Sequence, residues 1–177
     1  AQISAEQDLE AYEKIMQDYD RAVQGGTADP AAAFENAASG LEKLVSSAKF
    51  GYVAEYGAYV LAGMYFKNGQ YAKAMPYYIA FADSSSSDFA ALALLQAALC
   101  AEETGDIKKA VEICRQVEKD YEESPYMDRA CYTLGRLYAR DGNVMAAREY
   151  FLKVVNTYQQ SAYVEKATAR LFLLGNN

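Results

Sequence analysis

The stretch that decides the fold is residues 134–147, which read LGRLYARDGNVMAA. Two earlier stretches share its spacing of small residues around a central glycine. Residues 61–74 read LAGMYFKNGQYAKA, and residues 97–110 read AALCAEETGDIKKA. The central glycines of the three stretches lie 36 and then 37 residues apart. Apolar residues recur at helical spacing on both sides of each glycine. A repeat of this period predicts a stack of antiparallel helical hairpins.

The rest of the chain extends this pattern to an all-α prediction of about nine helices, because strand-like alternation is absent. Ser4 and Gln7 resemble a capping box at the start of the first helix. Asp29 followed by Pro30 predicts the start of the second. The expected helices span residues 4–23, 30–48, 52–68, 70–83, 87–104, 106–122, 125–141, 143–158 and 161–174.

Small residues recur at equivalent places in the predicted hairpins. A small side chain at a helix crossing lets the two axes approach to about 8–10 Å, and a neighbouring aromatic ring fills the remaining space. We therefore expect these residues to be buried. They are Ala62, Ala98 and Gly135 in the first helices, and Ala74, Ala110 and Ala147 in the second helices.

Composition and charge narrow the classes of function. The 177 residues are 52% hydrophobic, which allows a substantial core in one domain. The net charge is −7, and residues 1–30 hold seven acidic and two basic side chains. An acidic chain repels phosphate backbones, so we expect protein partners and no nucleic acid.

Histidine is absent, which removes serine–histidine and cysteine–histidine catalysis and every imidazole metal ligand. We therefore expect no enzyme, metal site or cofactor. Cys100, Cys114 and Cys131 are far apart, and they are either buried thiols or one disulfide with a spare thiol. The pairs Glu102–Glu103 and Glu122–Glu123 are expected to be solvated, because consecutive helical side chains diverge by about 100°.

At the repeated residues the chain resembles the tetratricopeptide repeat (TPR) family, whose unit is about 34 residues long. The resemblance covers residues 52–158, and the second unit departs from it with Ala97, Ala101 and Cys114 where larger residues are usual. It implies a TPR-like α-solenoid and a single domain over residues 1–177. That domain divides into an N-terminal hairpin (1–51), three units (52–158) and a capping helix (159–177).

The hairpin ahead of the repeats and the ending from Tyr158 through Ser161 to Val164 resemble periplasmic tetratricopeptide proteins of bacteria. Two groups fit: YfgM-like ancillary subunits of the SecYEG translocon, and Tol–Pal-associated or outer-membrane-assembly lipoproteins. The resemblance implies a non-catalytic envelope scaffold that binds assembly or translocation machinery. Because the chain opens at Ala1, we expect a processed form that has lost a signal peptide, lipid anchor or membrane helix. A cytoplasmic location stays open.

In this family the first helix of each unit lines a concave groove, which the resemblance places on this chain. Leu92, Leu95 and Leu99 are expected to form an exposed apolar face. Three arginines around Tyr132 could hold a carboxylate or an acidic helix. The carboxylate clamp of chaperone-binding members is not predicted, because it needs lysine and asparagine at two of these positions. The predicted partner-binding residues are Tyr56, Tyr59, Phe66, Leu92, Leu95, Leu99, Arg129, Tyr132, Arg136 and Arg140, with Gly63, Lys67, Glu102, Glu103 and Ala139 beside them.

Two alternatives remain open for this groove. The first helix carries an apolar stripe that includes Leu9, Tyr12 and Tyr19, so it could cover the groove of its own chain or of a second copy. In that case the chain is a structural subunit that forms homo-oligomers. The arginines could also be solvated beside acidic neighbours on their own helix.

Overall fold

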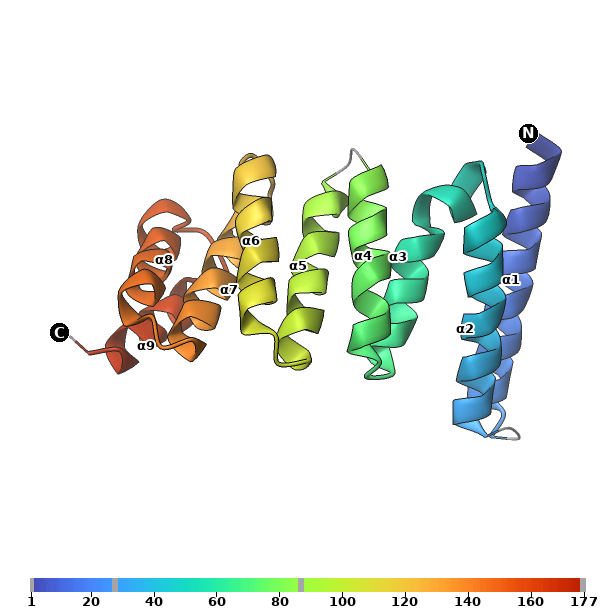
Figure 1. The fold of residues 1–177 in the computed structure, drawn as a ribbon, viewed down its shortest axis with the longest axis horizontal. Coiled ribbons are helices and arrows are strands. Elements are labelled where there is room, and N and C mark those ends of the chain that lie inside the picture. Colours follow the sequence, from blue (N-terminus) through green and yellow to red (C-terminus); the bar gives the residue numbers. More distant parts are fainter. Residues whose placement is uncertain (1, 27–28, 86–87, 176–177) are drawn as a thin grey trace. The chain divides into compact units, whose positions relative to one another are not determined.

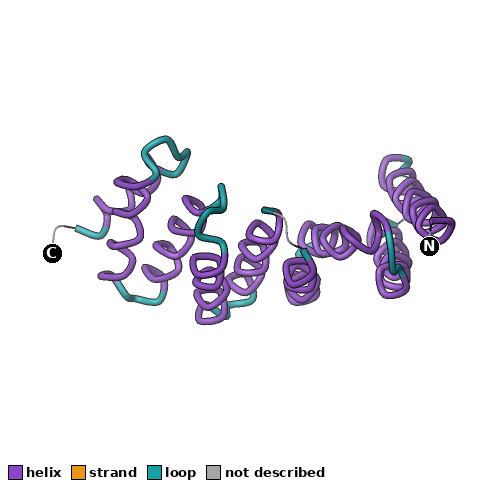
Figure 2. The backbone as a smooth tube through the Cα atoms, turned by 90° about the horizontal axis from the view of Figure 1, so that it is seen from above, coloured by secondary structure: helices purple, strands orange, loops and turns teal. Residues whose placement is uncertain are grey.

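The computed structural model describes residues 2–26, 29–85 and 88–175, and all the regular structure there is helical (Figures 1 and 2). This confirms the all-α prediction of about nine helices. No helix among these residues is both long and apolar enough to cross a bilayer. The helices are α1 (Gln2–Gln24), α2 (Pro30–Ser47), α3 (Gly51–Lys67), α4 (Tyr71–Ser84), α5 (Phe89–Glu103), α6 (Ile107–Asp120), α7 (Met127–Arg140), α8 (Val144–Thr157) and α9 (Val164–Leu173).

The helices fall into two compact units, Ala1–Ser85 and Ser86–Asn177. In the first unit, α1 packs on α2 and α3, and α3 packs on α4. In the second unit, each helix from α5 to α9 packs on the next. The expected single-domain organisation over residues 1–177 stays a prediction.

The three repeat glycines end their helices in the same way. Gly69, Gly105 and Gly142 have φ angles of 73°, 85° and 81°, a region that residues with a Cβ rarely adopt. The N–H of the following residue donates to the carbonyl five residues earlier, at 2.9, 2.8 and 2.8 Å. This is the Schellman arrangement. Asp106 and Asn143 then cap the next helices through their side-chain oxygens. The glycine spacing thus sets the hairpin spacing.

The small residues at the predicted crossings are buried, as expected. The five alanines at these positions are between 0% and 1% exposed, and Gly135 is also buried. A Cβ built on Gly135 would lie 2.6 Å from Cε1 of Phe151, which is closer than real side chains approach. The α7/α8 crossing therefore depends on glycine.

Three expected helix starts differ from the structure. Helix α1 begins before Ser4, so the predicted capping box is wrong. Helices α7 and α9 begin two and three residues later than expected, because Ser124 and Ser161 form turns instead. Each hydroxyl accepts the N–H two residues on, at 3.2 and 3.0 Å, and this competes with helix formation. Asp29 is an N-cap as predicted, accepting the Ala31 N–H at 3.0 Å.

The fifth helix was expected from residue 87, and residues 86 and 87 lie outside the described part of the chain. All three cysteines are free and buried, as the first alternative predicts. Burial raises the pKa of the Cys100 and Cys114 thiols to about 12, and that of Cys131 to about 11.

Candidate interaction surface

The predicted aromatic residues of the first unit lie on α3 and lean against α4. The ring of Tyr59 lies 5.1 Å from that of Phe81, and the Tyr56 ring lies 6.0 Å from the same ring. Phe66 makes an edge contact with Tyr71 at 5.1 Å. All three predicted residues are half-buried, so each has one packed side and one accessible side. Of their predicted neighbours, Gly63 is half-buried and Lys67 is exposed.

The expected face of three exposed leucines on α5 is wrong at Leu95, which is 2% exposed. Leu92 and Leu99 are half-buried. Helix α5 is apolar around most of its circumference, with ten of its 15 residues buried. A helix of this kind is covered on most sides. Of the three predicted leucines, Leu92 and Leu99 keep accessible surface for a partner.

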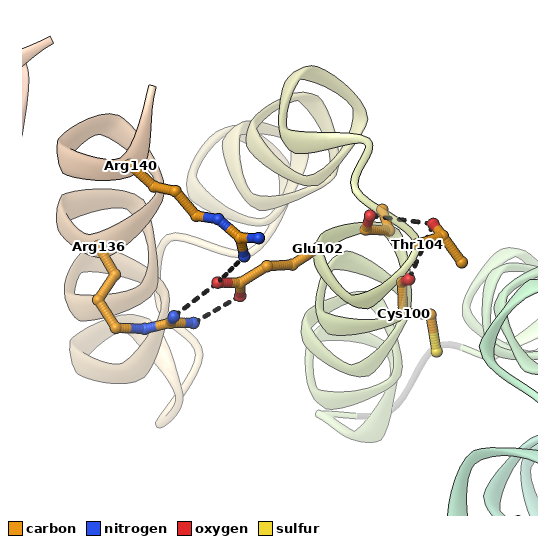
Figure 3. A network of polar contacts seen from close by, with 6 residues as sticks. Cys100, Glu102, Thr104, Arg136 and Arg140 are labelled. Carbon is orange, nitrogen blue, oxygen red and sulfur yellow. Dashed lines mark hydrogen bonds and ion pairs between the residues drawn. The ribbon is translucent and has the colours of Figure 1, made fainter. Parts of the chain in front are cut away.

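Glu102 sits on the same helix, and it is buried rather than solvated, which corrects the expectation for this residue. Its side chain is 6% exposed. Arg136 donates to its two carboxylate oxygens at 2.7 and 2.7 Å, and Arg140 donates to Oε1 at 3.2 Å (Figure 3). Glu103 is exposed, as expected. The carboxylate that the arginines hold is thus one from the chain itself.

We call Glu102, Arg136 and Arg140 the Glu102 cluster. Its three side chains are charged, and their charges stabilise one another. The hydrogen bond from Arg136 lowers the pKa of the Glu102 carboxyl, and burial opposes this effect. The same hydrogen bond raises the pKa of Arg136. A buried carboxylate is tolerated only when it is paired and hydrogen-bonded. The bidentate geometry supplies this and joins α5 to α7.

Arg129 and Tyr132 also bind neighbouring hairpins. Arg129 donates to the side-chain oxygen of Gln96 at 2.8 Å, which gives α5 and α7 a second connection. The Tyr132 ring stacks on Tyr163, just before α9, with centroids 5.0 Å apart. The arginines thus bind side chains of another helix rather than acids on their own, although Arg140 is 55% exposed, as the solvated alternative expects. Their partners lie on the preceding hairpin.

An open pocket of about 430 Å³ lies beside the Glu102 cluster. Three of its lining residues are arginines and one is a carboxylate. Arg140 is 55% exposed at its side chain and uses one nitrogen on Glu102. Arg170 is exposed and makes no hydrogen bond or ion pair through its side chain to any residue described. The lining residues are Glu102, Arg136, Ala139, Arg140, Phe151 and Arg170.

The sequence pattern did not predict Gln96, Tyr163 or Arg170 as site residues, although the polar pairs between hairpins follow a simple rule. The Gln96–Arg129 and Glu102–Arg136 pairs are 33 and 34 residues apart. On the second helices, Glu118 accepts from Lys153 Nζ at 2.8 Å across 35 residues. Each separation is slightly shorter than the 36- to 37-residue repeat. Complementary polar residues at this separation therefore indicate contacts between hairpins.

Comparisons with known proteins agree with this architecture. Residues 92–124 and residues 128–161 each match a tetratricopeptide repeat family model. A tetratricopeptide repeat protein from Parabacteroides merdae, known from a crystal structure, superposes on 93% of the chain with a TM-score of 0.67 and 18% sequence identity. The chain spans 60% of the length of that protein, and the likeness concerns the fold. No curated protein sequence matches the chain.

The two matched segments contain most of α5 and α7 and all of α6 and α8, together with the Glu102 cluster. They are the hairpins whose turns at Gly105 and Gly142 have the same geometry. Residues 92–124 and 128–161 are therefore similar to tetratricopeptide repeats in sequence and in the geometry of their turns.

Proposed function

We propose that this chain is a non-catalytic protein–protein interaction scaffold of the bacterial cell envelope. Repeats of this family generally mediate protein–protein interactions. Each unit binds partner segments through its own first-helix surface, which we define as the accessible side chains of α3 in the unit Ala1–Ser85 and of α5 and α7 in the unit Ser86–Asn177. The envelope location is supported by the sequence resemblance to periplasmic tetratricopeptide proteins.

One observation carries the binding proposal: half-buried aromatic side chains on first helices are held by neighbours but keep an accessible side. Tyr132 is stacked on Tyr163, and Tyr56 leans on Phe81. A side chain that is already ordered loses little entropy when a partner binds. Tyrosine and arginine are also the residues most enriched at binding hot spots.

The packing of α1 within its own unit disfavours the homo-oligomer alternative. Part of the apolar stripe of α1 packs on α2 and α3 of its own unit. The ring of Tyr12 lies 5.5 Å from that of Tyr52 on α3. Homo-oligomer formation through α1 stays a prediction, and light scattering of the full chain tests it.

Site-specific photo-crosslinking in cells of the source organism tests the binding proposal. A benzoylphenylalanine replaces Tyr56 or Tyr132 on the first helices, or Leu152 on α8 as a control. Leu152 is 41% exposed, so the control probe also reaches solvent. We expect a discrete protein adduct from the tyrosine positions and none from Leu152. Adducts only from Leu152, or from no position, would reject the first-helix surface.

Fractionation of the same cells tests the location. An epitope-tagged chain recovered with envelope fractions supports the proposal, with a cytosolic enzyme as the marker for leakage. Recovery with the cytosolic marker alone would reject the envelope location and leave the binding result untouched.

A further inference from the structure

We propose that the pocket beside the Glu102 cluster binds the acidic side chains of an extended partner segment, with Arg140 and Arg170 as the cations that hold them. This inference rests on the proposed function and names the chemistry of the partner. All the residues that carry it lie on α5, α7, α8 and α9, within one compact unit.

The first step is the charge of the pocket. Three arginines face a single carboxylate, so two positive charges are left uncompensated. Glu102 occupies two nitrogens of Arg136 but only Nη1 of Arg140. A guanidinium has five N–H donors, so Arg140 keeps donors for a second carboxylate. The side chain of Arg170 donates to none of the residues described, so all of its N–H donors remain available.

The second step is the position of the cations. Arg140 is tethered by Glu102, so its guanidinium is held at the pocket edge before a ligand arrives (Figure 3). A cation that is already oriented loses less entropy on binding than a free surface arginine. Ala139 and Phe151 add apolar lining, which suits the methylene groups of a glutamate side chain.

The third step is the choice among anions. The chain carries a net charge of −7, and residues 86–177 hold 13 acidic and 11 basic side chains. A long polyanion would meet repulsion beyond the pocket. A terminal carboxylate offers one negative charge, whereas Arg140 and Arg170 remain as two cations because Arg136 is taken by Glu102. Two separate cations with spare donors instead suit two acidic side chains of one segment.

The probe is a fluorescein-labelled hexaglutamate peptide with an amidated C-terminus, titrated with the full chain at low salt by fluorescence anisotropy. Replacing Arg140 or Arg170 with glutamine should weaken binding about 5-fold each, as expected for a partly exposed charge pair. Lys119→Gln and Lys108→Gln on α6 remove the same charge from exposed sites outside the pocket, and should change affinity less than about 2-fold. Circular dichroism verifies the fold of each variant.

The Glu102→Gln substitution should change the affinity for hexaglutamate in the opposite direction. It removes the negative charge of the pocket but retains a side chain that can accept from the arginines. We expect the folded variant to bind hexaglutamate more tightly than the wild-type chain. Weaker binding by the folded variant would contradict the electrostatic argument.

Three outcomes overturn the inference. The first is no binding by the wild-type chain, and the second is an equal loss of affinity in all four single-charge variants, which would indicate net charge alone. A glycine–serine peptide with a free C-terminal carboxylate could also bind as tightly as hexaglutamate, which would assign the pocket to chain ends. The photo-crosslinking experiment distinguishes failure of this inference from failure of the proposed function. If photo-adducts from Tyr132 persist while the peptide experiment fails, the first-helix surface stands and only the acidic partner is rejected.

Discussion

Replacing Gly135 with alanine tests the close approach of α7 and α8. The added Cβ would lie 2.6, 2.7 and 3.0 Å from three ring atoms of Phe151. That ring is 0% exposed, so it has no solvent-filled space into which it can move. The helices must separate or the ring must leave its preferred rotamer.

The magnitude follows from two opposing terms. Overpacking of a well-packed core costs about 1–3 kcal/mol, and three short contacts to a rigid ring place this site at the upper end. Alanine favours the helix over glycine by about 1 kcal/mol. We expect Gly135→Ala to lower the free energy of unfolding by about 2 kcal/mol.

Gly63 on α3 supplies a matched control, because the same substitution meets no crowding there. Its Cβ would find only the Tyr78 hydroxyl, at 3.8 Å, which is ordinary contact. Gly63→Ala should therefore stabilise its unit by about 0.5–1 kcal/mol through helix preference alone. The two identical substitutions thus have opposite signs.

Urea unfolding followed by circular dichroism measures both variants, and an unchanged m-value ensures that the comparison is valid. Phe151→Leu completes a double-mutant cycle, in which Gly135→Ala should cost at least about 1 kcal/mol less beside leucine than beside phenylalanine. A neutral or stabilising Gly135→Ala in the wild-type background would refute the close-approach argument. So would an additive cycle.

Three further predictions concern the second unit. Arg136→Met should cost about 2–3 kcal/mol of unfolding free energy by urea titration, because it strips the bidentate partner from buried Glu102 and leaves only Arg140. The folded-state pKa of Glu102 is lowered, so its stabilisation is present above the unfolded value of about 4.3 and is lost as pH falls through the folded pKa. The difference in unfolding free energy between wild type and Glu102→Gln should accordingly shrink below about pH 5, and a pH-independent difference would contradict the pairing. The thiols of Cys100 and Cys114, with pKa values of about 12, should react with a disulfide reagent at least about 100-fold more slowly in the native chain than in urea, and equal rates would show that they are accessible.

The fold could be predicted from the sequence because the deciding residues act locally. A helix that ends in a Schellman turn needs a positive φ, and glycine is the residue that adopts it without strain. Gly105 and Gly142 therefore mark turns in the printed sequence. Helix starts were less predictable, because Ser124 and Ser161 can either cap a helix or close a turn before it. The local sequence does not distinguish these two uses.

The surface was only partly predictable, because helical periodicity identifies a face but not what covers it. Leu95 and Leu99 lie four residues apart on α5, yet one is buried and the other half-buried. Glu102 follows Leu95 by seven residues and so shares its buried face. A single carboxylate on such a face requires a cationic partner. That partner is Arg136, which follows 34 residues later in the sequence. Spacing between repeats, rather than within one helix, contained this information.

Some side chains of the second unit keep unused hydrogen-bond donors after they have paired within the chain. These side chains determine which partners the unit can bind. If residue 102 accepted no hydrogen bond, the neighbouring guanidinium groups would repel one another, and their flexible side chains would spread into solvent. With Glu102, one charge is neutralised and Arg140 is held close to Arg136 by a carboxylate that both share. The internal ion pair therefore reduces the number of free cations but fixes the position of one that remains. A partner then gains affinity from a placed charge rather than from net charge, and this is why Arg140→Gln and Lys108→Gln should differ although each removes one positive charge.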